Sequence, residues 1–501
     1  MPGLKHPALG WLIVMVGGCA TVDPAPKVGE AIDLVEQRTG QKPAWTVPWD
    51  EQPPNWDVET ILNLQDAVGM ALRNNRKLRA DLEMIGQANA DLVQAGLLKN
   101  PMFDFMIMFP DGGGRTMLRS TALPMQALQD LWLIPARKEA AAAELQQAVL
   151  RVADTAVETA MQVKTVYARL QYTQRAIELI QENMAVVDQS TRLIEVRQTA
   201  GQATQVEANM SRIRSLRLRS ELIAMQADYR SLQRELLMLM GFAQAGDSWK
   251  VEPLSEATDA PESPAEEVAL LTLAADQRLD LKAAEWNVRA AEAEVRLMRR
   301  EAWPEVGLGF SFERSPAPRS RNLGIPGQVG NAAAQGAVNG LTGMTPQPPM
   351  VEPFSVMRRE VTYTLGPMIQ MEVPIFDQNQ AQIAKAFHEF RQRLAEYEAR
   401  GQEISRAVRE AQVMYAQARE QLEFYRDSVM PEVERNLQLA QQSFVAGQED
   451  LTVYLQVQED LIMTRLKMLE FLRDSLVRRA ELEREVGGRL EAPPPATQPS
   501  E

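Results

Sequence analysis

Apolar positions recur at helical spacing over most of the chain. Between residues 137 and 197 they follow one another every three or four residues, from Ala153 through Tyr167 to Ile194, without proline or glycine. This spacing places them on one face of a helix and is typical of coiled-coil packing. Such a helix would be about 90 Å long, far beyond the usual length in globular domains. Similar spacing predicts helices over residues 64–98, 204–240, 266–302, 380–444 and 450–486.

The period changes to two in short segments that follow a proline. After Pro101 the apolar side chains of Phe103, Phe105 and Ile107 alternate with other residues, and the same alternation occurs over 305–314 and 360–376. Successive side chains of a strand point to opposite faces, so each segment is a strand with one apolar face. The Gly- and Pro-rich stretch Ser315–Pro353 between the last two segments predicts a long exposed loop.

The chain is an internal duplication. Val68–Pro101 corresponds without a gap to Leu271–Pro304 at an offset of 203. Ala200-Gly201-Gln202 recurs as Ala446-Gly447-Gln448 at an offset of 246. Each glycine fits a left-handed helix cap, and Thr204 or Asp450 then fits the start of the next helix. Each repeat therefore predicts a helix, a pair of strands and a helical hairpin with a short tip.

The N-terminus resembles a bacterial lipoprotein leader. Lys5 precedes the apolar segment Ala8–Val16, which is too short to span a membrane and fits a signal peptide. Val16-Gly17-Gly18-Cys19 resembles a lipobox, which predicts cleavage before Cys19 and lipidation of its thiol. The alternative is ordinary cleavage nearby with Cys19 incidental. Ala20, not Asp, follows Cys19, so the usual inner-membrane retention signal is absent.

Composition argues against several function classes. A net charge of −14 disfavours binding to nucleic acid. One cysteine and two histidines exclude an intrachain disulfide and disfavour a zinc site or a histidine-dependent triad. The chain has 25 methionines, which we interpret as packing residues rather than metal ligands. Without a nucleophile–base pair or phosphate loop, we predict no catalytic residue, no cofactor and no resident metal.

Four strands with one apolar face suit a membrane β-barrel but cannot close one, because small barrels need about eight. Several copies would have to contribute, and a soluble β-sandwich is the alternative. Four stretches resemble the TolC family of outer-membrane efflux channels over nearly the whole mature chain. They are Leu64–Val68 through Leu98–Pro101, Asp280–Glu285, Val373–Gln380, and Ala446–Gln448 with the helix that follows it.

The resemblance implies a mainly α fold: a homotrimer with a 12-stranded β-barrel in the outer membrane and an α-helical tunnel in the periplasm. It implies an efflux conduit working with a periplasmic adaptor (membrane fusion) protein and an inner-membrane pump. The stretch Val373–Gln380 is similar to the branch that serves heavy-metal resistance-nodulation-division pumps. The alternatives are an outlet for type I protein secretion and a non-transport coiled-coil scaffold.

The expected organisation follows from these assignments. The signal peptide is 1–18 and a lipidated, extended segment with packed tryptophans is 19–60. The first repeat is 61–241, with strands at about 101–125 and a hairpin tip at 198–204. After a linker at 242–265, the second repeat is 266–487, with strands at about 304–314 and 359–376 and a tip at 444–450. The tail 488–501 is expected to be disordered.

The resemblance also implies two kinds of site at the hairpin tips. The adaptor would dock on Ala200, Gly201, Gln202, Thr204, Ala446, Gly447 and Gln448. Family members often carry Leu and then Asp after the second tip, but Thr452 and Gln456 stand there in this sequence. Glu449 and Asp450 are the alternative source of a charged gate, against a plain solvated helix start. We expect neutral substitution of both to increase solute leakage.

Overall fold

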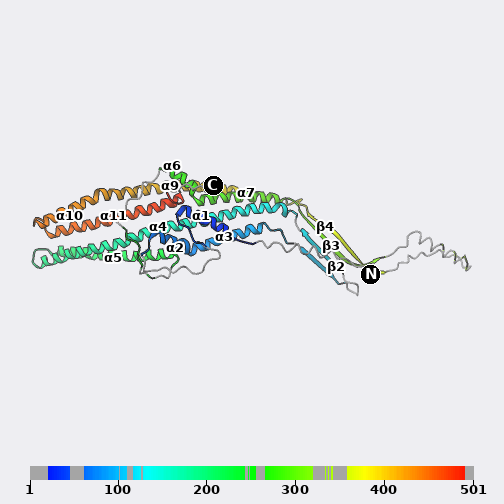
Figure 1. Cartoon of the computed structure of the whole chain (residues 1–501), viewed down its shortest axis with the longest axis horizontal. Coiled ribbons are helices and arrows are strands. Elements are labelled where there is room, and N and C mark those ends of the chain that lie inside the picture. The colour runs from blue at the N-terminus through cyan, green and yellow to red at the C-terminus, as the bar shows by residue number, and fades with distance from the viewer. Residues whose placement is uncertain are drawn as a thin grey trace, which may run out of the picture. The chain divides into compact units, whose positions relative to one another are not determined.

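The computed structural model consists of helices and one antiparallel sheet (Figure 1). It describes residues 21–45, 61–100, 102–109, 117–125, 128–242, 246, 249–254, 266–319, 333, 337, 340–341 and 358–490. The helices are α1 (Ala25–Thr39), α2 (Leu64–Asn74), α3 (Arg76–Ala95), α4 (Asp130–Thr199), α5 (Gln205–Met240), α6 (Glu267–Gln277), α7 (Leu279–Glu301), α9 (Gln380–Phe424), α10 (Met430–Val445) and α11 (Leu451–Val486). A π-helical turn, η2 (Tyr425–Val429), separates α9 from α10. The predicted mainly α class with few strands is confirmed.

The chain divides into two compact units, and each takes residues from both repeats. One unit contains 1–95, 137–295 and 385–501, which hold most of the helices. The other contains 96–136 and 296–384, which hold the strands. Among the described residues, none of the helices combines enough length and apolarity to cross a membrane.

The sheet pairs the two repeats through their strands. Its order is β1 (Met102–Met108), β2 (Met117–Met125), β3 (Glu305–Arg319) and β4 (Arg358–Glu372), with every neighbouring pair antiparallel. The register aligns Phe312 with Leu365 on one face, and Glu313 with Thr364 on the other. One face is therefore mostly apolar and the other mostly polar. The side chains of the apolar face are exposed to solvent in the single chain; Leu365, for example, is 74% exposed.

Four helices of the helical unit form a layer in the order α5, α4, α11, α10 (Figure 1). Arg212 of α5 bonds Glu195 of α4, and Lys164 of α4 bonds Glu483 of α11. Phe444 of α10 stacks on Tyr454 of α11 at 5.8 Å between ring centroids. Helices α4 and α11 therefore have a neighbour on both sides, whereas α5 and α10 have one.

Small side chains let the central helix α4 pack closely on several neighbours. Ala153, Ala156 and Ala160 are fully buried in a core that also contains residues of α1, α2, α3, α5 and α7. The hydroxyl of Tyr167 in α4 donates to the carbonyl of Leu62 at 2.8 Å. The apolar stripe predicted from the sequence is thus the part of α4 that its neighbours cover.

The same helix junction is built twice. In the first repeat, Asn75 Nδ2 donates to the carbonyl of Leu239 at the end of α5, 2.9 Å away. In the second repeat, Arg278 donates to the carbonyl of Glu485 at the end of α11, also 2.9 Å away. Asn75 and Arg278 differ by 203 positions, and Leu239 and Glu485 differ by 246. The two residues of this contact are therefore equivalent in the two repeats, one at the offset of 203 and the other at the offset of 246.

Two glycines allow these junctions to close. Gly241 (φ +80°) and Gly487 (φ +92°) end α5 and α11 in the left-handed conformation. A Cβ at Gly241 would lie 2.4 Å from the carbonyl oxygen of Asn74, and one at Gly487 would lie 2.9 Å from the backbone of Arg278. Conformation and space both require glycine here.

Four expectations for the helices and the N-terminal segment were wrong. The predicted helix over 266–302 is broken at Arg278, which has an extended backbone between α6 and α7. The stretch expected to be extended contains α1, which begins at Ala25 and is capped by Gly40 with φ +73°. The predicted helix over 64–98 is broken at Asn75, whose side chain accepts from the N–H of Leu78 and restarts the helix. The predicted helix over 380–444 is interrupted by η2. At Asn75 the cause is a local hydrogen bond, which apolar periodicity does not detect.

One packing expectation holds where it can be seen. Trp45 is buried and its indole N–H donates to the carbonyl of Leu72 at 2.8 Å. The leader, Cys19, Trp49, Trp56, most of the linker and the tail after 490 lie outside the described residues, as does most of the loop Ser315–Pro353. Strand β3 extends to Arg319, five residues beyond its predicted end at 314.

We expect Gly241→Ala and Gly487→Ala each to destabilise the protein by about 2 kcal/mol or more, because each substitution combines a left-handed backbone with a clash against backbone atoms. The measurement is the apparent unfolding temperature of the detergent-solubilised protein. Gly401→Ala is the matched control, since Gly401 lies inside α9 and a Cβ there would meet no atom within 4 Å. It should stabilise by about 0.5–1 kcal/mol. Equal effects at the three positions would contradict the junction.

Candidate functional site

The first hairpin tip is a short turn held by local bonds. Helix α4 ends at Thr199, and Gly201 follows with φ +74°. The N–H of Gln202 donates to the carbonyl of Arg197 at 2.7 Å. Thr204 then caps α5 reciprocally with Glu207, whose pKa is lowered by the backbone N–H and hydroxyl of Thr204. The turn therefore has a single defined shape.

The second tip repeats this turn with one chemical change. Gly447 has φ +69°, and the N–H of Gln448 donates to the carbonyl of Ser443 at 2.9 Å. Neither tip glycine has any atom within 4 Å of a potential Cβ, so in the single chain the turn alone requires glycine. Asp450 takes the position of Thr204, but its carboxylate pairs with Arg197 of the first hairpin.

Two ion pairs connect the hairpins near their tips. The guanidinium of Arg197, at the end of α4, binds the carboxylate of Asp450 and lies 3.3 Å from the hydroxyl of Thr452. Further from the tips, Arg214 of α5 binds Glu459 of α11 at 3.0 Å. The hydrogen bond from Arg197 lowers the pKa of Asp450, so the pair stays ionised over the ordinary pH range. We call Arg197–Asp450 and Arg214–Glu459 the tip ion pairs.

A groove of about 420 Å³ runs between α4, α5 and α11 beside these pairs. Thr452 and Gln456 both line it, together with Arg214 and Glu459. Burial raises the pKa of Glu459 above its ordinary value. Of the four candidate gate residues, the structure thus brings Asp450, Thr452 and Gln456 to the groove or its ion pairs. Glu449 is exposed at the second tip.

Sequence reasoning missed the basic partners. Neither Arg197 nor Arg214 lies in a recognisable motif, and their acids are more than 200 positions away. A signal was nevertheless present, because α5 carries Arg212, Arg214, Arg217 and Arg219 in an acidic chain. Such a run on a helix beside an acidic hairpin favours interhelical pairing.

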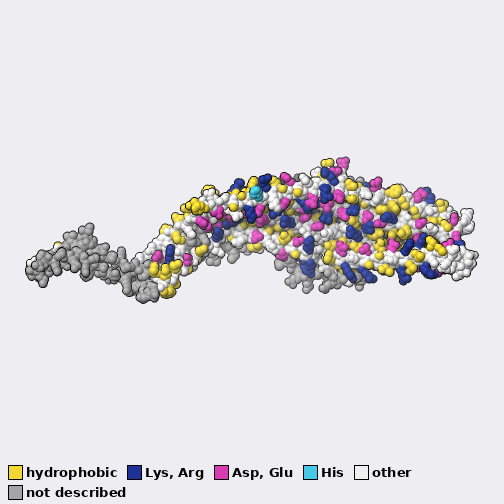
Figure 2. Space-filling model, turned by 180° about the vertical axis from the view of Figure 1, so that it is seen from behind, with side chains coloured by type: hydrophobic (Ala, Val, Ile, Leu, Met, Phe, Trp, Pro, Cys, Tyr) yellow, Lys and Arg dark blue, Asp and Glu magenta, His cyan; other side chains and the backbone are white. Residues whose placement is uncertain are grey.

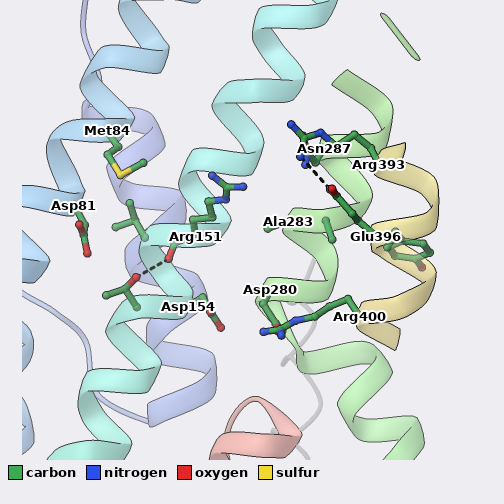
Figure 3. Close-up of a pocket in the computed structure, with 14 residues that line it drawn as sticks. Asp81, Met84, Arg151, Asp154, Asp280, Ala283, Asn287, Arg393, Glu396 and Arg400 are labelled. Carbon is green, nitrogen blue, oxygen red and sulfur yellow. Dashed lines mark hydrogen bonds and ion pairs between the residues drawn. The ribbon is translucent and has the colours of Figure 1, made fainter. Parts of the chain in front are cut away.

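A second group of charges surrounds a cavity of about 500 Å³ between α3, α4, α7 and α9 (Figure 3). Asp280 of α7 accepts from Arg278 at 2.7 Å and from Arg400 of α9 at 2.7 Å. Arg278 also binds Glu485 of α11 at 3.0 Å. This network, which replaces the neutral Asn75 contact of the first repeat, ties α7, α9 and α11 together. Arg400 is the member most exposed to solvent.

Asp154 of α4 lines the same cavity and adds a further carboxyl group beside the Asp280 network (Figure 3). Burial raises its pKa to about 6, and the negative charges of Asp280 and Glu158 add to this, against the attraction of Arg278 and Arg400. Asp280 behaves in the opposite way. Burial also opposes its ionisation, but hydrogen bonds from the two arginines outweigh burial and lower its pKa. The two carboxyls therefore titrate far apart.

Neither region has the donors of a metal centre. Within the described ranges, no three Cys, His, Asp or Glu side chains lie close enough to hold an ion. His388 is on α9, flanked by Phe387 at 6.3 Å between ring centroids. The side chains around the groove and the cavity form hydrogen bonds and ion pairs between helices.

Comparison with known proteins assigns the architecture. Residues 270–488 match the family model described as outer membrane efflux protein. The match covers 219 of the 501 residues and spans nearly the whole second repeat. The resemblance to the TolC family that the sequence motifs indicated is thereby confirmed. No curated protein sequence matches the chain significantly.

Solved channels of this kind have the same fold over most of the chain. CusC is 17% identical with a TM-score of 0.64, over 90% of this chain and 98% of that chain. The open state of the Neisseria gonorrhoeae MtrE outer membrane channel is 16% identical with a TM-score of 0.62, over 89% and 99%. VceC, an outer membrane protein of Vibrio cholerae, is 16% identical with a TM-score of 0.60, over 85% and 97%. The efflux-protein fold therefore extends to the first repeat.

Asp154 gives a pH-dependent prediction. Because its pKa in the folded protein lies above the unfolded value near 3.9, its ionisation costs stability at pH above about 6, and this cost disappears as the pH falls below about 4. Asp154→Asn should therefore stabilise the protein at pH 7.5 by about 2–3 kcal/mol and leave it unchanged near pH 4. Unfolding temperature measured against pH checks this.

Asp280→Asn is the control with the opposite sign. Its carboxylate accepts from both arginines and its pKa is lowered, so the substitution should destabilise the protein at pH 7.5. A stabilising effect of both substitutions at neutral pH would mean that general charge reduction, and not the position of Asp154, is responsible.

Proposed function

We propose that the protein is the outer-membrane channel of a tripartite efflux system, passing substrates from an inner-membrane pump and a periplasmic adaptor to the exterior. This function is supported by one observation: the sheet and the helix layer are both incomplete in a single chain, and residues 270–488 match the outer membrane efflux protein model. The sheet exposes an apolar face, and the helix layer has two edges without a neighbour. The channel does no chemistry, and its role is to enclose a path.

Three copies complete the sheet. Four strands are too few for a barrel, whereas three copies supply twelve, within the range of bacterial outer-membrane barrels. The apolar face, with Phe105, Phe310 and Leu365 exposed, would then contact lipid. The polar face, with Glu313, would line the interior. This arrangement supports a homotrimer in the outer membrane.

The helix layer closes by joining its two different edges. On α5, Ile213, Leu216 and Ile223 form an exposed stripe with the spacing of a coiled-coil seam. Arg212, Arg217 and Arg219 flank it, and basic side chains recur along the lower right edge of the helical part in Figure 2. The opposite edge exposes Val413, Phe424 and Leu439 beside Glu420 and Glu432. Unlike edges join head to tail, and such contacts generate rings.

The hairpin tips are the proposed docking points for the adaptor. They present backbone and small polar groups at Ala200, Gly201, Gln202 and Thr204 in one hairpin, and at Ala446, Gly447 and Gln448 in the other. Their open surroundings leave room for a partner's backbone. We also propose a pump of the resistance-nodulation-division type, on the resemblance of Val373–Gln380.

The tip ion pairs are the proposed gate, with Thr452 and Gln456 lining the groove beside them. The Arg197–Asp450 pair is exposed to solvent, and such pairs contribute only about 0.2–1 kcal/mol, whereas Glu459 of the second pair is half-buried. A docked adaptor could therefore break the Arg197–Asp450 pair at little energetic cost. Glu449 contributes negative charge at the same tip.

A lipid on Cys19 is the proposed anchor in the outer membrane. The support is the lipobox-like sequence that ends at this residue, together with Ala20 after it. Metabolic labelling with a palmitate analogue should tag the wild-type protein but not Cys19→Ser. Tagging of both would place the lipid elsewhere.

The proposed function is tested by fractionation and by susceptibility. The protein should be recovered from outer membranes in detergent as a trimer, and recovery in the soluble fraction would refute the proposal. A deletion strain should become more sensitive to metals, drugs or solvents. Loss of an exported protein without any change in sensitivity would indicate type I secretion instead.

Leu216→Asp should prevent trimer formation, because it places a charge in the seam between copies. Sedimentation of the detergent-solubilised protein measures this. Leu216→Met keeps volume and polarity and is the matched control, so it should remain trimeric. If Leu216→Asp sediments as a trimer, the α5 edge is not the interface.

Asp450→Asn should increase the conductance of single channels in planar bilayers. Loss of one exposed ion pair shifts the balance toward separated hairpins by about 1.4- to fivefold. Glu449→Gln removes the same charge one position away without breaking the Arg197 pair, and should have a smaller effect. Equal increases would favour a simple ring of negative charge over the ion pair.

A further inference from the structure

The buried stripe of the second long helix has one irregular step. Along α9 and α10 the residues packed inward are Val408, Tyr415, Ala418, Leu422, Met430, Val433 and Leu437. Their separations are three, four or seven positions, except for the eight between Leu422 and Met430. Seven positions of an α-helix return to the same face within about 20°, but eight turn about 80° away from it. An uninterrupted α-helix would place Met430 about 80° away from Leu422, toward the edge of the buried stripe.

The π-helical turn η2 absorbs this extra residue. The N–H of Met430 donates to the carbonyl of Tyr425, five positions earlier, where an α-helix would use four. Pro431 follows directly, has no N–H and disfavours the continuous α-helix at this point. π-Helical turns are rare, and they often mark functional sites.

The turn itself is only partly buried. None of its five residues is buried, although Leu422 before it and Met430 after it are. Tyr425 contacts Phe471 of α11 at 4.7 Å between ring centroids, so the two helices of the hairpin touch at the turn. Helix α4 of the other hairpin has no such interruption between Pro135 and its end.

The two sides of η2 are held by different contacts. On the side away from the tip, Arg400 of α9 joins the partly buried network with Asp280 and Arg278. On the tip side, the second hairpin meets the first through the tip ion pairs and through apolar side chains such as Val186 of α4 and Leu455 of α11. The links beyond η2 therefore include an exposed ion pair, Arg197–Asp450, that can open in water.

We propose that η2 is the hinge about which the tip of the second hairpin moves away from the first when the tip ion pairs open. The hinge rests on the proposed function, because it assigns the moving part of the same gate. The extra residue lets this helix bend without losing its buried stripe. The first hairpin, lacking such a turn, is the fixed side.

The variant that tests the hinge removes the extra residue and keeps the stripe. Deletion of Ser428 together with Pro431→Ala restores a seven-position step between Leu422 and Met430 and the missing N–H. Ser428 is exposed, so no packed side chain is lost. Pro431→Ala alone keeps the extra residue and is the matched control. Trimer formation and unfolding temperature establish that both proteins fold.

Conductance is compared with and without the tip ion pairs, which are removed by Asp450→Asn and Glu459→Gln. We expect the ion-pair variant to conduct more than wild type, and the straightened helix to suppress most of that increase. The Pro431→Ala control should preserve it. An increase of the same size in the straightened helix would overturn the hinge.

A distance measurement separates failure of the hinge from failure of the gate. Spin labels at Gln202 and Gln448 lie at the exposed tips of the two hairpins, outside the edge residues proposed for the seam between copies. A protein without the two introduced cysteines controls for labelling of Cys19. Breaking the tip ion pairs should lengthen and broaden the distance, and straightening η2 should reverse this. If the distance lengthens on loss of the ion pairs and shortens again when η2 is straightened, but the conductance does not change, then the gate proposal fails and the hinge stands. Unaltered distances in the straightened helix would refute the hinge.

Discussion

A wall one helix thick must bury apolar side chains on two opposite sides of every helix. The central helices α4 and α11 satisfy this requirement within one chain, since each lies between neighbours. The outer helices α5 and α9–α10 satisfy it on one side only, and their second stripes remain exposed. The sheet has the same deficiency on its apolar face. A single copy of this protein therefore leaves apolar side chains of these helices and of the sheet exposed.

The ion pairs at the duplicated junction and those at the hairpin tips differ in their burial. At the duplicated junction, Arg278 and Asp280 are largely buried and satisfy one another and a helix end. Removing one partner there would leave a charge without compensation, which is expensive. At the tips, Arg197 and Asp450 are solvent-exposed, so their separation costs little. One end of the hairpins is consequently fixed and the other is free to respond to a partner.

Local pattern predicted the strands and the hairpin tips because each depends on residues close in sequence. Gly201 and Gly447 need a left-handed turn, and Thr204 finds its cap three residues away. The break at Asn75 escaped prediction, because a single polar side chain decides it and leaves no period. The π-helical turn was visible in principle as an eight-position step between Leu422 and Met430, but only once burial identified the stripe.

The sequence by itself determined the duplication, the lengths of the hairpins and the alternation of the strands. Each of these follows from periodicity or from short-range backbone chemistry, which a linear chain records directly. Only the tertiary structure decided that Arg197 meets Asp450 and that Asp154 faces Asp280. Partners more than a hundred positions apart are chosen by how the helices pack, and side-chain periodicity carries no information about which charged neighbours that packing brings together.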